Sequence, residues 1–216
     1  MTKSTFAIGS SEGCKRKTSR LRRQFVQPRG LLGSIVGWLL AIKNRERSEW
    51  VVSLLDVQPT DHVLEVGFGP GVDIRRVSAI AIKGLVAGVD HSDVMLRQAR
   101  KRNPTAIRAG RVNLQLGTMA KLPHPAESFD KVFGINAFEF SDDPLATLQE
   151  FRRVLKPGGL LAIAIQPRSQ GATVETSRKA GRDLVAAFES AGLRGVHLES
   201  KDLKPVPVIC ALGTKV

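Results

Sequence analysis

Cysteines are scarce in this chain, and long apolar runs are absent. Cys14 and Cys210 lie at opposite ends of the 216 residues, so they form neither a metal-binding spacing nor a disulfide framework, which suits a reducing compartment. The apolar stretch LLGSIVGWLLAI (31–42) is shorter than the roughly 18 residues of a membrane span, and no A-x-A-like cleavage site follows it. We therefore expect neither a membrane span nor a secretory signal peptide.

Acidic residues are rare near the start of the chain. Residues 1–23 hold seven basic residues and one acid, Glu12, and so carry six of the thirteen net positive charges. Their Ser, Thr and Gly content and lack of periodicity predict a disordered basic tail over 1–27. Such a tail could contact an anionic surface, in particular a peripheral membrane, and no specific nucleic-acid partner is predicted. We expect a cytoplasmic protein, with mitochondrial targeting through the Arg- and Ser-rich start as the alternative.

After the QPTD turn (58–61) the pattern alternates between strand and helix. Helices are expected at 31–43, 45–57, 72–82, 93–102, 144–155 and 176–191, and strands at 62–67, 85–90, 112–116, 130–137, 160–165, 195–200 and 206–212. The KPGG stretch (156–159) is expected to end the fifth helix, which Asp142 or Asp143 would cap. The alternation predicts an α/β fold, a doubly wound sheet of seven strands that is mostly parallel, with a C-terminal antiparallel hairpin strand.

Glycines follow the first strand directly in VLEVGFGPG (63–71). In doubly wound sheets the ligand lies outside the carboxyl ends of the strands, where these glycines fall. The glycines at 67, 69 and 71 read G-x-G-x-G, whereas dinucleotide-binding folds use G-x-G-x-x-G/A. The third small residue of that pattern would stand at Val72, so the sequence opposes a dinucleotide site.

Four stretches in order resemble the class I S-adenosylmethionine (SAM)-dependent methyltransferases of small-molecule type. They are VLEVGFGPG, VAGVDHSDVMLRQAR, LGTMAKLPHPAESFDKVFGINAFEF and LQEFRRVLKPGGLLAIA, and the resemblance covers about residues 45–216. It implies a Rossmann-like fold and SAM as cofactor. We expect a single domain over 28–216, with an N-terminal helical cap at about 31–57 because the apolar residues of that segment are not used by the expected sheet.

The resemblance also implies cofactor-binding residues. Glu65 would meet the ammonium of SAM, and Asp90 would accept the ribose hydroxyl protons. Beside Asp90, His91 would either stack on the adenine or face solvent as a loop residue. Relatives often carry an acid where this chain has Thr118, which suggests looser adenine recognition. The full expected set is Glu65, Gly67, Phe68, Gly69, Gly71, Asp90, His91, Met95, Thr118, Met119, Asn136 and Ala137.

On the acceptor side the candidate catalytic residues are Asn136 and Glu139, and no metal is expected. The alternative for Glu139 is a rim carboxylate that faces solvent. Apolar residues of the expected cap, including Leu31 and Trp38, either cover the acceptor or pack on the flank of the sheet. The predicted function is methyl transfer to a small organic acceptor, hydrophobic or lipid-like if the cap covers it. The alternatives are a methyltransferase acting on RNA or protein, and a non-catalytic SAM-binding relative.

Overall fold

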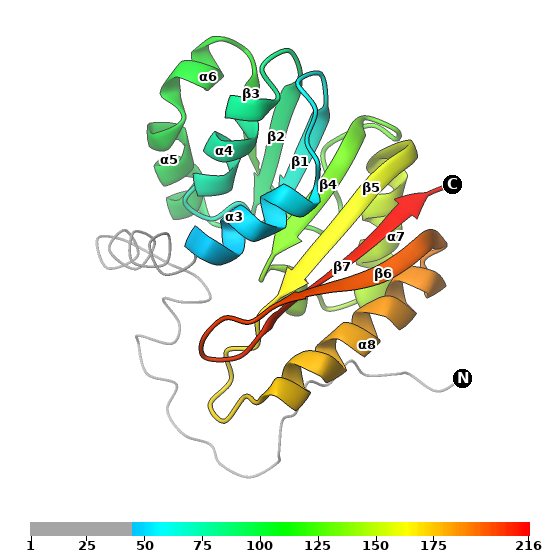
Figure 1. Ribbon diagram of the computed structural model, residues 1–216. Helices are drawn as coiled ribbons and strands as arrows, with labels where there is room; N and C mark the ends of the chain where they lie inside the picture. Colours follow the sequence, from blue (N-terminus) through cyan, green and yellow to red (C-terminus); the bar gives the residue numbers. More distant parts are fainter. Residues whose placement is uncertain (1–44) are drawn as a thin grey trace.

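The computed structural model describes residues 45–216 (Figure 1). The tail expected over 1–27 and the helix expected over 31–43 lie outside the described residues, as does most of the expected cap. None of the helices within residues 45–216 combines the length and the hydropathy that a membrane span requires.

The core of the fold is a seven-stranded sheet in the order β3-β2-β1-β4-β5-β7-β6. Strands β1 to β5 are parallel neighbours, whereas β7 runs antiparallel to both β5 and β6. Their bounds are β1 His62–Val66, β2 Leu85–Asp90, β3 Val112–Leu116, β4 Phe129–Ile135, β5 Leu155–Ile165, β6 Leu193–Lys201 and β7 Val208–Lys215. The predicted doubly wound sheet with an antiparallel C-terminal strand is confirmed.

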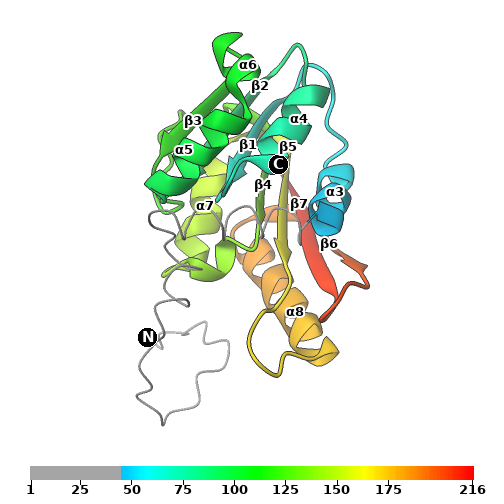
Figure 2. The same ribbon diagram turned by 90° about the vertical axis from the view of Figure 1, so that its left-hand side faces the viewer.

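Helices cover both faces of this sheet (Figures 1 and 2). One apolar cluster joins the sheet to α3, α4 and α5, and a second joins it to α7 and α8. The helices are α3 Arg45–Leu54, α4 Val72–Ile80, α5 Asp93–Arg102, α6 Pro104–Arg108, α7 Pro144–Val154 and α8 Val174–Ser190, with a 3-10 turn η1 at Phe138–Phe140. The two clusters bury both faces of the sheet. A ligand is therefore expected at the ends of the strands and not on a face of the sheet.

Side-chain caps fix where three helices begin. The Ser92 hydroxyl accepts from the Met95 N–H at the start of α5, and the Asp143 carboxylate accepts from the Ala146 N–H at the start of α7. Thr173 caps α8 in the same way. The α5 bounds agree with the predicted 93–102, and Asp143 provides the cap expected of it or its neighbour.

Two local features differ from the predictions. Helix α7 ends at Val154, just before KPGG, but the strand expected over 160–165 already begins at Leu155, which pairs with Phe129 of β4, so KPGG lies inside β5. A shift of register between Phe129 and Lys131 accommodates the stretch, and Gly158 takes φ +77° there. The short helix α6 was not predicted either, because five residues are too few to show helical periodicity.

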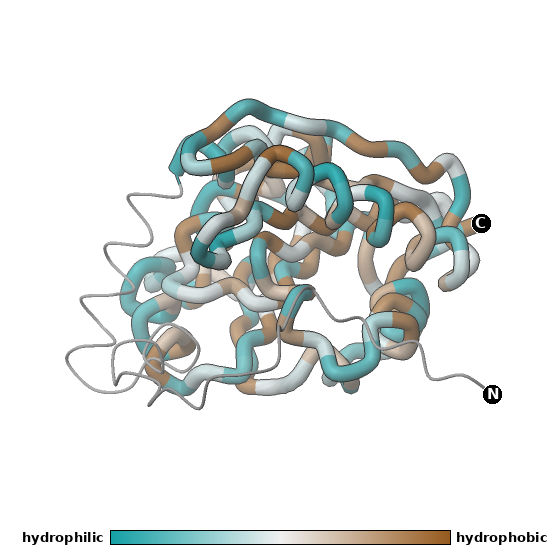
Figure 3. Tube along the Cα trace, turned by 90° about the horizontal axis from the view of Figure 1, so that it is seen from below, coloured by the Kyte–Doolittle hydropathy of each residue, from teal (hydrophilic) through white to brown (hydrophobic). Residues whose placement is uncertain are grey.

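The carboxyl ends of the parallel strands meet along one edge, which lies at the bottom of Figure 1 and faces the viewer in Figure 3. The loops after β1, β2, β3, β4 and β5 all leave from this edge, and α3 begins beside it. The residues expected to bind cofactor and acceptor are therefore brought to one side of the molecule.

Candidate functional site

Three glycines follow β1, and all three have positive φ: +75° at Gly67, +51° at Gly69 and +73° at Gly71. A Cβ at Gly67 would lie 2.4 Å from the Cβ of Ala137, and one at Gly71 would lie 2.6 Å from the Cβ of Ala99. A Cβ at Gly69 would meet no atom within 4 Å. Two of the three glycines are thus required by packing against Ala137 after β4 and against α5, and only Gly69 presents bare backbone to open space.

Asp90 ends β2 beside these glycines and is buried. One carboxylate oxygen accepts from the Gly69 N–H at 2.8 Å, and the other accepts from the Ser92 N–H at 2.8 Å. Its main-chain oxygen accepts from the Gly117 N–H at 2.9 Å, so the loops after β1, β2 and β3 meet at this residue. Burial raises the Asp90 pKa, and the two N–H groups oppose that rise. An ionised carboxylate has about four acceptor positions, so it keeps room for a ligand hydroxyl.

Glu65 lies inside β1, between Gly88 of β2 and Phe133 of β4. Its carboxyl is buried, and its Oε2 atom has no hydrogen-bond partner. Burial raises the pKa of Glu65 well above its usual range, and the nearby negative charges of Asp73 and Asp90 add to the rise. A buried carboxyl that keeps an unmet oxygen is suited to a cationic partner.

The remaining predicted cofactor residues divide between interior and rim. Phe68 and Met95 are buried in the packing around β2 and α5. The His91 side chain is about half exposed, with its Nδ1 atom 3.8 Å from Asp90 Oδ1. After β3, Thr118 is exposed and Met119 packs against the core. The structure thus brings His91 to Asp90 but puts Phe68 into the core.

Asn136 and Ala137 directly follow β4. The Asn136 side chain accepts from the Gln166 N–H at 2.9 Å and donates to the Gln166 carbonyl at 3.2 Å, in a residue whose φ is +50°. Its amide therefore joins the carboxyl ends of β4 and β5, which makes Asn136 a positioning residue in this geometry. Glu139 of η1 lies at the exposed rim, where partial desolvation raises its pKa against the opposing charges of Arg168 and Arg47.

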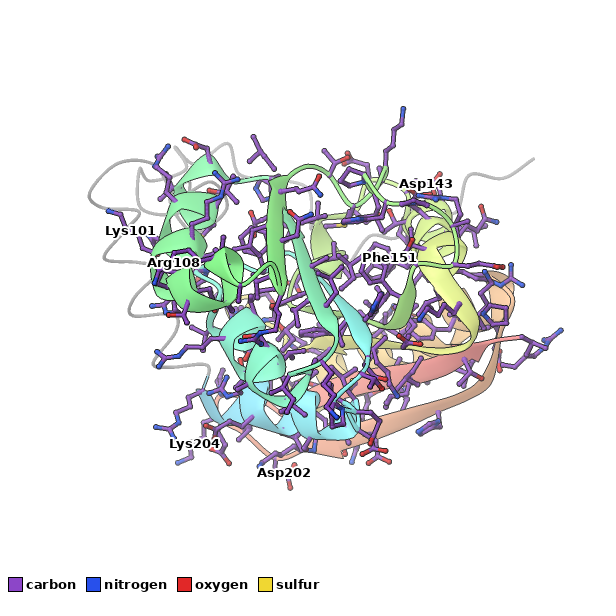
Figure 4. The ribbon with its side chains drawn as sticks, turned by 90° about the horizontal axis from the view of Figure 1, so that it is seen from above. Lys101, Arg108, Asp143, Phe151, Asp202 and Lys204 are labelled. Atoms are coloured by element: carbon purple, nitrogen blue, oxygen red, sulfur yellow. The ribbon has the colours of Figure 1, made fainter. Side chains whose placement is uncertain are left out.

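Sequence reasoning missed a buried arginine at this edge. Arg47 of α3 is only 4% exposed, and its Nη1 donates to Gln166 Oε1 at 2.7 Å. The Gln166 amide nitrogen donates to the carbonyls of Val206 at 2.8 Å and Lys204 at 3.2 Å in the β6–β7 connection. Figure 4 places Lys204 on the side of the molecule where α3 lies. The spacing of residues in the sequence could have indicated that Arg47 faces inward, since it stands four and eight residues before the buried Val51 and Leu55.

Within residues 45–216, no group of three or more His, Cys, Asp or Glu side chains is arranged to hold a metal ion. The donor set instead fits the expected nucleoside cofactor. Gly69 offers open backbone, Asp90 offers spare acceptor positions, and Glu65 offers an unmet buried oxygen.

Comparisons with known proteins agree with this arrangement. A family model described as a methyltransferase domain matches residues 64–163. An uncharacterized methyltransferase of Bacillus subtilis, YdaC, is 32% identical over 181 residues, which cover 84% of this chain and 98% of that protein. A demethylmenaquinone methyltransferase of Symbiobacterium thermophilum is 38% identical over 103 residues, 47% of this chain and 41% of that protein. A SAM-dependent methyltransferase structure from Aquifex aeolicus superposes with a TM-score of 0.62 at 23% identity, covering 78% of this chain and 89% of the other.

Proposed function

Because this chain belongs to the class I SAM-dependent methyltransferases, we propose that it transfers the methyl group of SAM to a small organic acceptor at the carboxyl ends of β4 and β5. The observation that carries the proposal is the open backbone at Gly69 beside the Asp90 carboxylate. Bound there, SAM supplies a methyl group activated by its sulfonium. The protein then has to align the acceptor and exclude water.

The residues of the cofactor side have separable tasks in this proposal. Asp90 accepts hydrogen bonds from the ribose hydroxyls, and Gly69 lets the ligand approach the main chain. Glu65 compensates the ammonium group with its buried carboxylate. Asn136 contributes by holding β4 and β5 in register at the edge where the acceptor binds.

On the acceptor side Glu139 is our candidate for a base. It lies in η1, four residues after the end of β4, and its raised pKa brings a carboxyl closer to the range in which it can take a proton near neutral pH. A base is needed only when the acceptor loses a proton before or during transfer. Replacement of Glu139 by Gln then lowers kcat with little change in SAM affinity.

A small acceptor is supported by the names of two relatives. The demethylmenaquinone methyltransferase is named for a small-molecule acceptor, and so is a 27-O-demethylrifamycin SV methyltransferase that is 29% identical over 160 residues. The chain spans 41% and 58% of their lengths, and their acceptors are not transferred to this protein. We propose only that the acceptor of this protein, like theirs, is a small molecule.

Calorimetry tests the cofactor site first. We expect the wild-type protein to bind SAM, and Asp90→Asn to weaken binding by about 1–3 kcal/mol, or roughly 5- to 150-fold, because hydrogen bonds to a charged acceptor are lost. The matched control is Asp93→Asn, three residues along, where the exposed carboxylate pairs with Arg97 instead. Equal affinities in Asp90→Asn and wild type would refute the site.

The acceptor class is tested by release of S-adenosylhomocysteine. Wild-type protein and SAM are incubated with a panel of small alcohols, phenols, amines and acids, and with RNA and protein in parallel. Turnover with a small molecule supports the proposal. Turnover confined to RNA or protein would overturn it.

A further inference from the structure

Helix α5 contacts the cofactor site at both of its ends. At its start stands Ser92, whose N–H donates to the Asp90 carboxylate at 2.8 Å. Its last turn lies against the glycine loop, residues 67–71, where Ala99 leaves no room for a side chain at Gly71. Helix α4, which follows that loop, lies beside α5 (Figures 1 and 2). One helix therefore reaches both the carboxylate and the loop on which the proposed cofactor site depends.

Two consecutive side chains at the end of α5 bind the main chain of the glycine loop. The Nδ2 atom of Asn103 donates to the Gly71 carbonyl at 3.0 Å. The Nη1 atom of Arg102 donates to the Pro70 carbonyl. Two successive carbonyl groups of the loop are thus held by side chains that lie more than 30 residues further along the chain.

The direction of the Gly69 N–H depends on such restraints. This N–H donates to Asp90 at 2.8 Å, but Gly69 has no side chain that packing could hold in place. Before it, the Gly67 N–H donates to the Val89 carbonyl at 2.8 Å, and after it come the two carbonyls held by α5. Because glycine has more backbone freedom than any other residue, the bonds on either side of Gly69 set its conformation.

Asn103 has a role beyond ending the helix. Its main-chain N–H already donates to the carbonyls of Ala99 and Arg100 at the end of α5. The side chain is only 4% exposed, and its Nδ2 atom donates to Ala99 at 2.8 Å as well as to Gly71, whereas its Oδ1 atom has no hydrogen-bond partner among residues 45–216. A buried polar atom without a partner destabilises the fold. What the amide adds in return is its bond to Gly71, outside the helix.

Arg102 reaches the same loop from an electrostatically unfavourable position. Burial and the neighbouring positive charge of Arg75 both lower the pKa of Arg102. Its place at the C-terminal end of α5 offsets part of this, because the helix dipole favours a positive charge there. One neutral and one charged side chain thus serve the same stretch of main chain.

We propose that Asn103, supported by Arg102, is a positioning residue for SAM. This inference rests on the proposed function and adds to it a residue that acts through the main chain of the glycine loop. By holding the carbonyls of Pro70 and Gly71, the end of α5 keeps the Gly69 N–H on Asp90 before the cofactor arrives. Without the amide, SAM has to order the loop as it binds, which weakens its affinity.

Calorimetry of SAM binding to variants of the full chain tests the role of the amide. Asn103→Asp keeps the shape of the side chain but removes both N–H donors, and Asn103→Ala removes the amide altogether. We expect each variant to bind SAM at least about 10-fold more weakly than wild type, because the bond to Gly71 is lost and the loop is released. Wild-type affinity in both variants overturns the inference.

Ser177→Ala is the matched control for a general loss of stability. Ser177 of α8 is fully buried, and its hydroxyl donates to the Pro207 carbonyl at 2.8 Å, so the variant also loses a bond from a buried side chain to the main chain. Thermal melting without ligand reports the stability of each variant. Ser177→Ala should melt below wild type and still bind SAM within about twofold of it. A loss of SAM affinity as large as that of Asn103→Ala would show that affinity follows stability, and it overturns the inference.

A double-mutant cycle with Asp90→Asn shows whether Asn103 acts through Gly69 and Asp90. The weakening caused by Asn103→Ala should be at least about threefold smaller in the Asp90→Asn background, because the bond that the loop positions is already altered there. Equal weakening in the two backgrounds overturns the inference. Absence of SAM binding by wild type would refute the proposed function, whereas wild-type binding that the Asn103 variants share refutes the positioning role alone.

Discussion

At the residue scale, the three glycines after β1 have different reasons for lacking a side chain. Gly67 and Gly71 make room for Ala137 and Ala99, and Gly69 alone opens onto unfilled space. Their spacing in the sequence is equal, so spacing could not separate the packing glycines from the ligand-facing one. The distinction depends on which distant element approaches each position.

Gly69→Val is predicted to abolish SAM binding, because its side chain would enter the space beside Asp90. Gly110→Val is the matched control, since Gly110 also has positive φ, +70°, and also faces open space. Both variants should lose similar folding stability, roughly 1–2 kcal/mol or more, from the left-handed backbone. Calorimetry with SAM should show loss in Gly69→Val only, and equal binding by the two variants would contradict the assignment.

Glu65 is predicted to link SAM binding to pH. Its pKa is raised in the unliganded protein by burial and by Asp73 and Asp90, whereas an ammonium partner requires the carboxylate. Affinity should therefore rise with pH up to that pKa, by at most about tenfold per unit, and then level off. Glu65→Gln should bind weakly with little pH dependence, as calorimetry in a pH series would show.

The raised pKa of Glu65 makes the stability of the folded protein fall with rising pH, whereas SAM affinity rises. A carboxyl that is harder to ionise when folded favours the folded state below its unfolded pKa of about 4.3, and this contribution is lost as pH rises through the folded pKa. Glu65→Gln should thus melt above wild type at alkaline pH and close to it in acid. Glu189→Gln, at an exposed position of α8, should show no such difference.

Single residues were predictable where a local pattern marked them. Asp90 was predicted from the resemblance of VAGVD to a family motif in which an acid ends the second strand, and the structure places it beside Gly69. Arg47 was not found, because its partner Gln166 lies 119 residues further along the chain. The pattern of α3 could show that Arg47 faces inward, but only the fold shows which side chain it meets.

At the element scale, the strands were predicted well because parallel strands buried on both faces give continuous apolar runs. The prediction differed from the structure where strand pairing, and not the residue pattern, sets the start of a strand. Leu155 pairs with Phe129 of β4, so β5 begins before the KPGG stretch and includes it. The connections between strands are less predictable than the strands. The β6–β7 connection, for example, is held by hydrogen bonds from the distant Gln166. Its amide holds that connection while its oxygen holds α3 through Arg47.

Gln166→Ala is predicted to loosen α3 and the β6–β7 connection together. Three side-chain hydrogen bonds are lost, one of them to a charged group, so the free energy of unfolding should fall by about 2–4 kcal/mol. Denaturant unfolding measures the loss, and hydrogen exchange should rise over 45–54 and 202–207. Gln170→Ala, exposed in the connection between β5 and α8, is the control. Unchanged exchange in both segments would show that Gln166 joins neither.

At the scale of the whole molecule, charge is unevenly distributed along the chain. The first 23 residues supply six of the thirteen net positive charges, while the site described above is built by residues 45–216. Attraction to an anionic surface and methyl transfer should therefore depend on different parts of the protein.

Removal of residues 1–27 is predicted to weaken binding to vesicles that contain phosphatidylserine, with each basic residue near the surface contributing up to about 1 kcal/mol. SAM affinity should not change. A full-length variant with Gln at the seven basic positions of residues 1–23 separates charge from length. Vesicle sedimentation at low and high salt measures the effect, and equal sedimentation of all three proteins would show that the charges do not mediate the contact.

The reversed direction of β7 has a practical consequence for tethering the protein. Because β7 runs against β5, Thr214 pairs with Leu160 near the start of the parallel part of β5, and the last residue lies across the sheet from the ligand-bearing ends of the strands (Figure 1). A linker attached after Val216 would anchor the molecule to a sensor chip or resin with its reactive side turned outward. Immobilised protein should then admit SAM and bulky acceptors as freely as protein in solution.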